Sequence, residues 1–407
     1  MKLRVAMVSE HASPLAPLGS PDAGGQNVYV DALARHLARL GVAVDVYTRR
    51  DDPAVPDVVH AEPGVQVHHV RAGPPSRIPK DELFALMPEF ATRLGESWRW
   101  RRPDIVHAHY WMSGWAARQT CPPGAPLVQT FHALGCVKRR HQGDADTSPV
   151  DREAVERALV AEADVIIATC QDEVAELVRL GGSRSRIEVV PCGVDRLFSP
   201  RRRGRFFRGR PQRRRVVCVS RMVERKGIGE LVRALVRLPP EVELIVAGGP
   251  PLDRIDEDPE IHRLRELATR IGVVERCRFV GSLGRAEVAE LLRSADVVAC
   301  TPWYEPFGIV PVEAMACGVP VVGTSVGGLL DTIEDGVNGL LVPPRRPDAI
   351  ATAIGTLLDD PARRRALGAA GARRADRLYR WPTVARAVLS VYSGALSARV
   401  APAAVTA

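Results

Sequence analysis

The sequence predicts an α/β protein built from two Rossmann-like domains. Short β-branched runs alternate with helical patterns, and the alternation restarts after an arginine-rich run at 201–215. Alternating β and α segments form parallel sheets that helices cover on both faces. The length of 407 residues also suits two or three domains of roughly 100–200 residues each. We therefore expect two doubly wound domains that face each other across a deep cleft.

The expected elements follow the apolar runs in order. In the first series the expected strands are 3–8, 43–48, 104–107, 126–130, 164–168 and 187–190, with helices such as 27–40 and 150–162. In the second series the expected strands are 216–220, 242–247, 277–281, 296–300, 320–322 and 339–342. The expected helices of that series are 228–238, 260–271, 286–294 and 308–317. Doubly wound sheets bind ligands beyond the carboxyl ends of their strands, so the loops after strands are expected to carry the chemistry.

These elements divide the chain into four segments. Residues 1–198 form the N-terminal Rossmann-like domain, and 216–380 form the C-terminal one. Between them, 199–215 is an arginine-rich linker interrupted by glycine and proline. The last segment, 381–407, is expected to be a helix with an alanine-rich tail that packs back toward the N-terminal domain.

Composition excludes several classes of protein. With 46% hydrophobic and 26% charged residues, the chain can bury a core. The eight cysteines are spread along the chain and contain no CxxC pair, which argues against a secreted disulfide scaffold. No apolar run approaches the roughly 18 residues of a membrane span, and the N-terminal apolar stretch is too short for a signal peptide. These features predict a cytoplasmic location.

The basic character is concentrated in the run 201–215. The run has nine arginines, and without them the formal charge of +8 would fall to −1. We expect either a solvated linker or a patch that makes peripheral contact with an anionic membrane or another polyanion. Because the remainder is nearly neutral, no nucleic-acid partner is predicted.

A basic pair follows the first strand of the second series. Arg221 and Lys226 lie five residues apart in a strand-to-helix turn that ends at Gly227. Arginine offers a fork of donors and lysine a point charge, so both can bind one phosphate group. The helix start after the glycine also favours an anion.

Two carboxylates follow the strand 296–300. Glu305 lies in the loop and Glu313 on the next helix, eight residues later. The loop carboxylate can accept hydrogen bonds from sugar hydroxyls, and the helix carboxylate can face a ribose diol. The backbone N–H groups of residues 307–309 lie at the helix start, where they are free to bind a diphosphate.

The E-x7-E element from Glu305 to Glu313, together with the R-x4-K element from Arg221 to Lys226, resembles the retaining GT-B glycosyltransferases of family 4. Members of that family include sucrose-phosphate synthases and an inositol-phosphate N-acetylglucosaminyltransferase. The resemblance covers nearly the whole chain and continues through Gly327-Gly328-Leu. It implies a GT-B fold and a retaining hexosyltransferase that uses a nucleotide sugar, with UDP favoured.

The resemblance also implies roles in donor binding. Arg221 and Lys226 would neutralise the donor diphosphate, and Glu313 would bind the ribose. Glu305 would hold the transferred sugar together with the N–H groups of the adjacent loop. The full implied donor set is Gly25, Arg221, Lys226, Glu305, Phe307, Gly308, Ile309 and Glu313.

Acceptor binding is assigned to the first domain. Asn27 follows the glycine pair Gly24-Gly25, which lets backbone N–H groups touch a phosphate or sugar. By the resemblance, Tyr110 contacts acceptor phosphate, and Lys80 and Arg152 align with phosphate ligands.

One position departs from the family pattern. Ala133 stands where the inositol-phosphate enzyme has a threonine. This departure puts inositol phosphate itself in question and leaves another phosphorylated or cationic small acceptor open.

The implied catalytic residues are His132, which touches the donor sugar, and Glu305. No metal site and no cofactor are predicted. The pair His107 and His109 has no third ligand at a recognisable spacing, and Asp144-Ala-Asp146 lies in a loop away from any expected nucleotide site. Arginine, lysine and helix dipoles can supply the positive charge of a metal ion.

Retention of anomeric configuration by double displacement needs a carboxylate on the face opposite the leaving group. The first domain offers no obvious candidate, so same-face attack with the departing diphosphate as base is the hypothesis. Two other functions stay open: a GDP-mannose-dependent, lipid-directed mannosyltransferase and a nucleotide-sugar 2-epimerase. The oligomeric state is not indicated by the sequence.

Overall fold

The computed structural model describes residues 2–16, 24–200 and 214–400, which form two compact units with separate sheets. Unit 1 comprises Met1–Pro191 and Trp381–Ala407, and unit 2 comprises Cys192–Arg380. The predicted membrane-contact run 201–215 lies outside the described residues apart from Arg214 and Arg215, which begin a strand.

Unit 2 starts earlier than the second domain of the sequence analysis. Residues 192–198 group with unit 2 because they are hydrogen-bonded to its far end. The Val194 N–H donates to the Tyr379 carbonyl at 2.6 Å. The Arg380 guanidinium donates to the carbonyl of Phe198 at 3.0 Å.

Unit 1 is built on an eight-stranded sheet with the order β3-β4-β2-β1-β5-β6-β7-β8. Its strands are β1 (Arg4–Val8), β2 (Ala43–Arg49), β3 (Val58–Glu62), β4 (Val65–Val70), β5 (Ile105–His109), β6 (Leu127–Thr130), β7 (Val165–Ala168) and β8 (Ile187–Val189). The central strands β5 and β6 are buried along their whole length, as apolar runs covered on both faces require.

The sequence analysis did not predict the hairpin of β3 and β4. This hairpin also corrects the prediction of a wholly parallel sheet, because β3 pairs with β4 antiparallel. Antiparallel neighbours need only a short turn, here with Gly64 at φ +88°. Since β3 is an exposed edge strand, it lacks the apolar run by which the buried strands were recognised.

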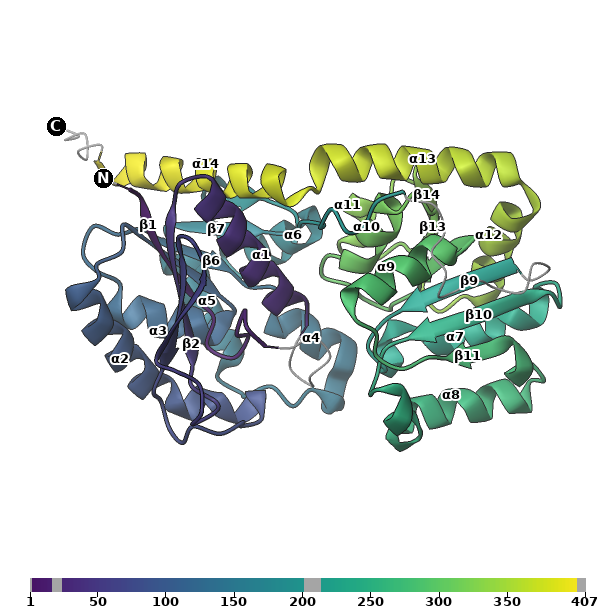
Figure 1. Cartoon of the computed structure of the whole chain (residues 1–407), viewed down its shortest axis with the longest axis horizontal. Coiled ribbons are helices and arrows are strands. Elements are labelled where there is room, and N and C mark those ends of the chain that lie inside the picture. Colours follow the sequence, from purple (N-terminus) through teal and green to yellow (C-terminus); the bar gives the residue numbers. More distant parts are fainter. Residues whose placement is uncertain (1, 17–23, 201–213, 401–407) are drawn as a thin grey trace. The chain divides into compact units, whose positions relative to one another are not determined.

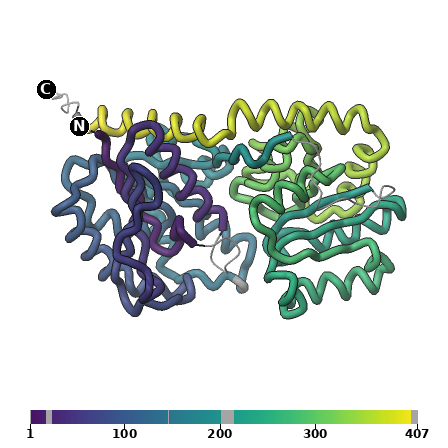
Figure 2. The backbone as a smooth tube through the Cα atoms, viewed as in Figure 1, coloured from purple at the N-terminus to yellow at the C-terminus, as the bar shows by residue number. Residues whose placement is uncertain are grey.

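Helices cover the sheet of unit 1 (Figure 1). They are α1 (Gly25–Arg39), α2 (Met87–Trp100), α3 (Trp111–Thr120), α4 (Gly135–Gln142), α5 (Arg152–Glu162), α6 (Gln171–Arg179) and α14 (Trp381–Val400). The C-terminal α14 packs beside α1, and the yellow and purple ends of the chain run together there (Figure 2). A buried aromatic contact joins Trp381 to Tyr29 of α1, with ring centroids 5.5 Å apart.

Unit 2 has a six-stranded, wholly parallel sheet with the order β11-β10-β9-β12-β13-β14. Its strands are β9 (Arg214–Val219), β10 (Val242–Ala247), β11 (Cys277–Phe279), β12 (Val297–Cys300), β13 (Val321–Thr324) and β14 (Gly339–Val342). This order is that of a doubly wound nucleotide-binding sheet, with the switch point between β9 and β12.

The helices of unit 2 lie on both sides of that sheet, with α8 on one side of β9 and β10 and α9 on the other (Figure 1). They are α7 (Ile228–Ala234), α8 (Pro259–Arg270), α9 (Arg285–Ser294), α10 (Ile309–Ala316), α11 (Leu329–Thr332), α12 (Pro347–Asp359) and α13 (Pro361–Leu378). Sequence analysis did not predict α12 and α13, although Pro347 and Pro361 mark their first turns.

Among the described residues, no helix is long and apolar enough to cross a membrane.

A buried hydrogen bond ties α14 into unit 1. The Tyr392 hydroxyl lies 2.7 Å from His107 Nδ1, and His107 Nε2 lies 2.9 Å from Thr130 Oγ1. Both ring nitrogens of this fully buried histidine are therefore paired. The last helix is thereby linked to the middle of β5 and the end of β6, the two strands that lead to the predicted site residues Tyr110 and His132.

Replacing Tyr392 by phenylalanine should destabilise unit 1 by about 1–3 kcal/mol, because it leaves His107 Nδ1 buried without a partner. Urea unfolding followed by tryptophan fluorescence measures this, since five of the six tryptophans belong to unit 1. Ser393→Ala on an exposed part of the same helix is the control and should change stability by less than about 0.5 kcal/mol. Equal transition midpoints for Tyr392→Phe and wild type would contradict the assignment.

Candidate functional site

The predicted donor residues of unit 2 lie on two loops that are packed directly against each other, and on α10, the helix that follows one of them. The R-x4-K turn follows β9, and the E-x7-E loop follows the neighbouring strand β12. Gly227 has φ +67°, and a Cβ there would lie 1.9 Å from the Thr301 carbonyl oxygen. Thr301 Oγ1 donates to the Gly227 carbonyl at 3.0 Å, and the Trp303 N–H donates to the Arg225 carbonyl at 2.8 Å. Only glycine permits this approach, so one residue holds both loops in contact.

Lys226 and Glu305, one from each loop, form an ion pair. Their side chains are only 15% and 19% exposed. In the sequence analysis these residues are a phosphate ligand and a sugar ligand, and the structure brings them together. A partly buried pair of this kind is screened less by water than a surface pair.

Further positive charge gathers around Lys226. Arg221, predicted from the sequence, is exposed. Arg225, which the sequence analysis missed, is half-buried; its burial and the nearby Arg221 lower its pKa, whereas Glu305 opposes this. Three cations within six residues of one turn favour a strongly anionic ligand. The R-x3-R-K spacing of the turn was the signal available for Arg225.

The loop that carries Glu305 is held by a glycine pair predicted only as a continuation of the family pattern. A Cβ on Gly327 would lie 2.2 Å from the Glu305 carbonyl oxygen, and the Gly328 N–H donates to that oxygen at 2.9 Å. At the end of the loop, Gly308 adopts φ +89° as the N-cap of α10. Among the described residues, none accepts a hydrogen bond from the backbone N–H groups of Phe307, Gly308 or Ile309.

Glu313 lies on α10 and is almost completely buried, with 6% of the residue exposed. Burial raises the pKa of Glu313 to about 7, while Arg285 opposes the shift and Asp195 adds to it. Arg285 Nη1 lies 3.7 Å from the carboxylate, and its guanidinium also covers the Phe198 ring at 5.2 Å. The sequence analysis missed Arg285. A buried carboxyl group with a displaced pKa is typical of a functional site.

In unit 1, the predicted residues His132 and Tyr110 follow β6 and β5. Both have positive φ, +61° for His132 and +82° for Tyr110, which non-glycine residues rarely adopt. Strained backbone of this kind clusters at functional sites. Of the described non-glycine residues, Arg345 alone shares this feature, and it stacks on Trp303 at 3.9 Å in unit 2.

His132 is partly buried and lies beside the fully buried His109, which in turn contacts the fully buried His107. His109 Nδ1 lies 3.1 Å from His132 Nε2, and the rings of His107 and His109 are 4.1 Å apart. Burial, followed by the other histidines, lowers the pKa of His107 and His132 to about 3 and that of His109 well below its usual value. The three histidines are therefore neutral at physiological pH. No group of three or more potential metal ligands occurs among the described residues.

Two predicted acceptor-binding cations lie over the Tyr110 ring. Lys80 Nζ is 4.8 Å from the ring centroid, and the Arg152 guanidinium carbon is 5.1 Å away. These contacts are cation–π interactions. Sequence positions 80, 110 and 152 thus converge at one place in unit 1.

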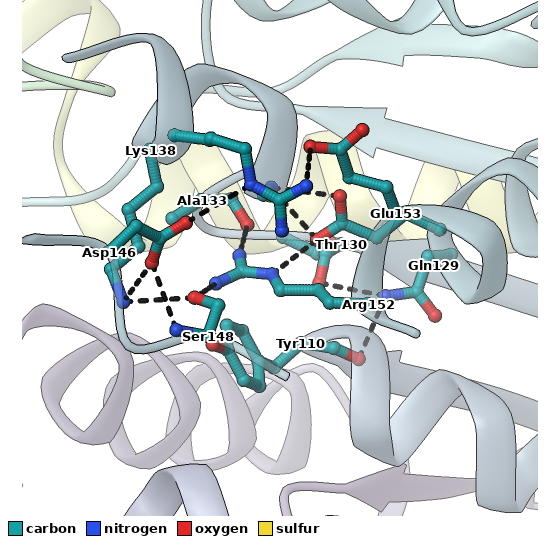
Figure 3. A network of polar contacts seen from close by, with 12 residues as sticks. Tyr110, Gln129, Thr130, Ala133, Lys138, Asp146, Ser148, Arg152 and Glu153 are labelled. Carbon is teal, nitrogen blue, oxygen red and sulfur yellow. Dashed lines mark hydrogen bonds and ion pairs between the residues drawn. The ribbon is translucent and has the colours of Figure 1, made fainter. Parts of the chain in front are cut away.

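Arg152 is also the centre of a polar network (Figure 3). It is 1% exposed and donates to Glu156 at 2.8 Å, to Ser148 at 3.2 Å and to the Ala133 carbonyl at 2.7 Å. These three bonds use three of the five N–H groups of the guanidinium and fix its orientation.

Asp146, from the stretch Asp144-Ala-Asp146, contacts residues next to the Arg152 network. It lies 2.9 Å from Lys138 Nζ and accepts the Ser148 N–H at 3.0 Å (Figure 3). This carboxylate therefore anchors the loop before Arg152.

The glycine pair Gly24-Gly25 is held in place by Asn27, which is 4% exposed. Its Oδ1 accepts the Gly24 N–H at 3.0 Å, and its Nδ2 donates to the Ser13 carbonyl at 3.0 Å. Gly25, predicted for donor binding, is the first residue of α1. Asn27 thus links Ser13 to Gly24. Residues 17–23, between these two positions, lie outside the described part of the chain.

Comparison with known proteins decides the family. The family model "Glycosyl transferase 4-like domain" matches residues 24–193, and "Glycosyl transferases group 1" matches residues 202–374. The D-inositol 3-phosphate glycosyltransferase of Xylanimonas cellulosilytica is 40% identical over 98% of both chains. The chain belongs to the family 4-like glycosyltransferases. A second relative, the D-inositol 3-phosphate glycosyltransferase of Kribbella flavida, is 39% identical over 96% of this chain and 95% of its own.

This glycosyltransferase also matches the solved structure of sucrose-phosphate synthase from Thermosynechococcus elongatus. The TM-score is 0.89 at 34% identity, over 98% of this chain and all of the other. The predicted GT-B fold and the predicted glycosyltransferase activity are therefore confirmed. The assignments of individual residues remain predictions.

Gly227→Ala should destabilise unit 2 by about 2–5 kcal/mol, because the new methyl group forces the two loops apart at a left-handed position. Gly272 is the matched control: it has φ +73°, and a Cβ there meets nothing within 4 Å. Gly272→Ala should cost only about 1–2 kcal/mol. Calorimetric unfolding of both variants measures the difference, and equal losses would refute the role of loop contact.

Glu313 should make nucleotide-sugar binding pH-dependent. Burial raises the pKa of the unliganded Glu313 carboxyl to about 7. The ionised carboxylate accepts hydrogen bonds from ribose hydroxyls more strongly than the protonated carboxyl does. Affinity should therefore rise as pH increases to about 7 and then level off, with one proton released on binding below that pH. A nucleotide sugar is the right probe, because a terminal phosphate itself titrates near pH 6.

Isothermal titration between pH 5.5 and 8.5 tests this dependence. Glu313→Gln should remove it and weaken binding about 10- to 100-fold. Glu257→Gln, which changes an exposed carboxylate of unit 2, should keep it. A wild-type affinity that does not vary over this range would rule out Glu313 as the titrating ligand.

Proposed function

We propose that this enzyme transfers a hexose or amino-hexose, with retention, from a nucleotide-diphosphate sugar to a hydroxyl of a small polyol, sugar or sugar phosphate. UDP is the favoured donor nucleotide. The observation that carries the proposal is the close contact between the loops that follow β9 and β12 in unit 2. Lys226 and Glu305 lie on these loops at the carboxyl ends of the strands, and the buried Glu313 lies on the helix that follows.

The donor is bound by charge and by free N–H groups. Arg221 and Lys226 neutralise the diphosphate, and the N–H groups of Phe307 and Ile309 donate to it beside α10. Glu313 accepts from the ribose hydroxyls, and Glu305 accepts from hydroxyls of the transferred sugar. Fixed charges aimed at a leaving diphosphate stabilise the transition state without reorganising, so no metal ion is required.

Transfer then proceeds by same-face attack. The bond between the anomeric carbon and the diphosphate breaks as the acceptor oxygen bonds to that carbon from the same side. The departing phosphate oxygen takes the proton of the acceptor hydroxyl. His132, which is neutral because its pKa is lowered to about 3, contacts the sugar as a hydrogen-bonding group rather than as a base. A trapped covalent glycosyl-enzyme would contradict this mechanism.

The acceptor is proposed to carry a phosphate. Lys80 and Arg152 supply the positive charge, and both lie at the ring of Tyr110. Asn27 completes the set from the glycine loop. The names of the relatives, D-inositol 3-phosphate glycosyltransferase and sucrose-phosphate synthase, support a polyol or sugar phosphate.

A panel of UDP-, GDP- and ADP-sugars with D-inositol 3-phosphate, fructose 6-phosphate or no acceptor tests the function. We expect one UDP-sugar to be consumed with a phosphorylated acceptor and the product to keep the anomeric configuration. Lys226→Met should lower kcat/KM on the order of 100-fold or more. Consumption of GDP-mannose only with lipid would favour the membrane-bound mannosyltransferase, and isomerisation of the donor without acceptor would favour the 2-epimerase.

A further inference from the structure

The side chain of Arg345 contacts the loop that carries Glu305 from two strands away. This loop, residues 301–308, follows β12 and is called the Glu305 loop below. Arg345 follows β14, and β13 lies between the two strands in the sheet. The guanidinium carbon of Arg345 nevertheless lies 3.9 Å from the centroid of the Trp303 ring. At this distance the cation is attracted by the negative face of the indole.

Arg345 has a left-handed backbone conformation, with φ +58°. A residue with a side chain loses about 5- to 30-fold in its folding equilibrium there, whereas glycine does not. Arg345 is exposed, and an exposed cation–π contact returns only about 2- to 5-fold. The contact with Trp303 therefore does not offset the strain. Stability does not explain the arginine, and retained strain of this kind points to function.

The guanidinium and the indole orient each other. Among the described residues, none forms a hydrogen bond or an ion pair with the Arg345 side chain. The neighbouring Arg346, which is also exposed, pairs with Asp348 at 2.7 Å. The Nε1 atom of Trp303 is buried and has no hydrogen-bond partner in the described part of the chain. Since no hydrogen bond fixes either group, the stacking sets the direction of both.

The backbone of Trp303 lies between the two residues of the central ion pair. Its N–H donates to the Arg225 carbonyl at 2.8 Å, directly before Lys226 in the chain. Two residues after Trp303 comes Glu305, which pairs with Lys226. The packing of the Trp303 ring therefore bears on the conformation of the segment that directs the Glu305 carboxylate.

We propose that Arg345 is a positioning residue for donor binding. By covering the Trp303 ring, it holds the Glu305 loop in the conformation that binds the transferred sugar. The contact acts on the sugar rather than on the nucleotide, because the ribose and the diphosphate are assigned to other residues of unit 2. This inference rests on the proposed function.

Three substitutions of Arg345 separate its charge from its backbone strain. Glycine and asparagine adapt to left-handed backbone and carry no cation, whereas lysine keeps both the cation and the strain. Arg345→Gly and Arg345→Asn should each lower kcat/KM for the UDP-sugar about 3- to 30-fold. Arg345→Lys should recover most of this loss. In all three variants the inhibition constant of UDP should stay within about twofold of the wild type.

Stability should not follow activity in this series. The midpoint of thermal unfolding should be no lower in Arg345→Gly and Arg345→Asn than in the wild type, because relief of strain offsets the lost contact. Arg346→Ala is the matched control, since it removes the same charge from the neighbouring exposed residue. It should leave kcat/KM within about twofold. Parallel losses of activity and stability at position 345 would indicate a merely structural role and overturn the inference.

Hydrogen exchange tests the position of the loop without turnover. In the unliganded protein, the Trp303 N–H should exchange at least about fivefold faster in Arg345→Gly than in the wild type, and at the wild-type rate in Arg346→Ala. Mass spectrometry of a peptide that spans 302–306 measures this rate. Pro302 and Pro306 have no N–H, so few other amides contribute.

The kinetic assay uses whichever UDP-sugar and phosphorylated acceptor the wild type consumes. An unchanged kcat/KM in Arg345→Gly overturns the inference and leaves the proposed function standing. A loss that Arg345→Lys does not recover also overturns it, because lysine keeps the cation. If the wild type consumes no UDP-sugar, the proposed function fails. Hydrogen exchange then decides the positioning role: faster exchange of the Trp303 N–H in Arg345→Gly supports it, and an unchanged rate overturns it.

Discussion

The contact between Gly227 and the Thr301 carbonyl determines the chemistry of unit 2. A Cβ would lie 1.9 Å from that oxygen, so any other residue would separate the loops after β9 and β12. These strands are neighbours at the switch point of the sheet, where a doubly wound fold opens to ligands. With the loops in contact, Lys226 from one can pair with Glu305 from the other. Under the proposed function, this contact joins the group that binds the donor diphosphate to the group that binds the sugar hydroxyls.

The two units handle charge in opposite ways. Unit 2 gathers cations on one turn and buries the Glu313 carboxyl, whose pKa is raised to about 7 by that burial. Unit 1 buries His107 and His109, which are neutral at physiological pH, and places Lys80 and Arg152 over the Tyr110 ring. Under the proposed function, a donor with two phosphates needs several fixed charges in unit 2. A phosphorylated acceptor needs fewer charges in unit 1, together with orientation of its hydroxyls.

Much of the fold and part of the site followed from the sequence. The buried parallel strands were recognisable because burial on both faces requires apolar runs, as β5 and β6 show. The edge strand β3 has no such run, and its antiparallel pairing was missed. Motif spacing predicted Lys226, Glu305 and Glu313, and the structure pairs the first two with each other. It did not predict Arg285, because the significance of Arg285 lies in its contact with Glu313, which is distant in the sequence.

The central claim is that the two loops after β9 and β12 in unit 2, which contact each other at Gly227 and Thr301, bind a nucleotide sugar. A crystal structure of the whole chain with a non-hydrolysable UDP-sugar tests it most directly. We predict the diphosphate against Lys226 and the N–H groups that begin α10, and the ribose hydroxyls on Glu313. A nucleotide bound in unit 2 with its ribose away from Glu313 and its phosphates away from Lys226 would contradict the account.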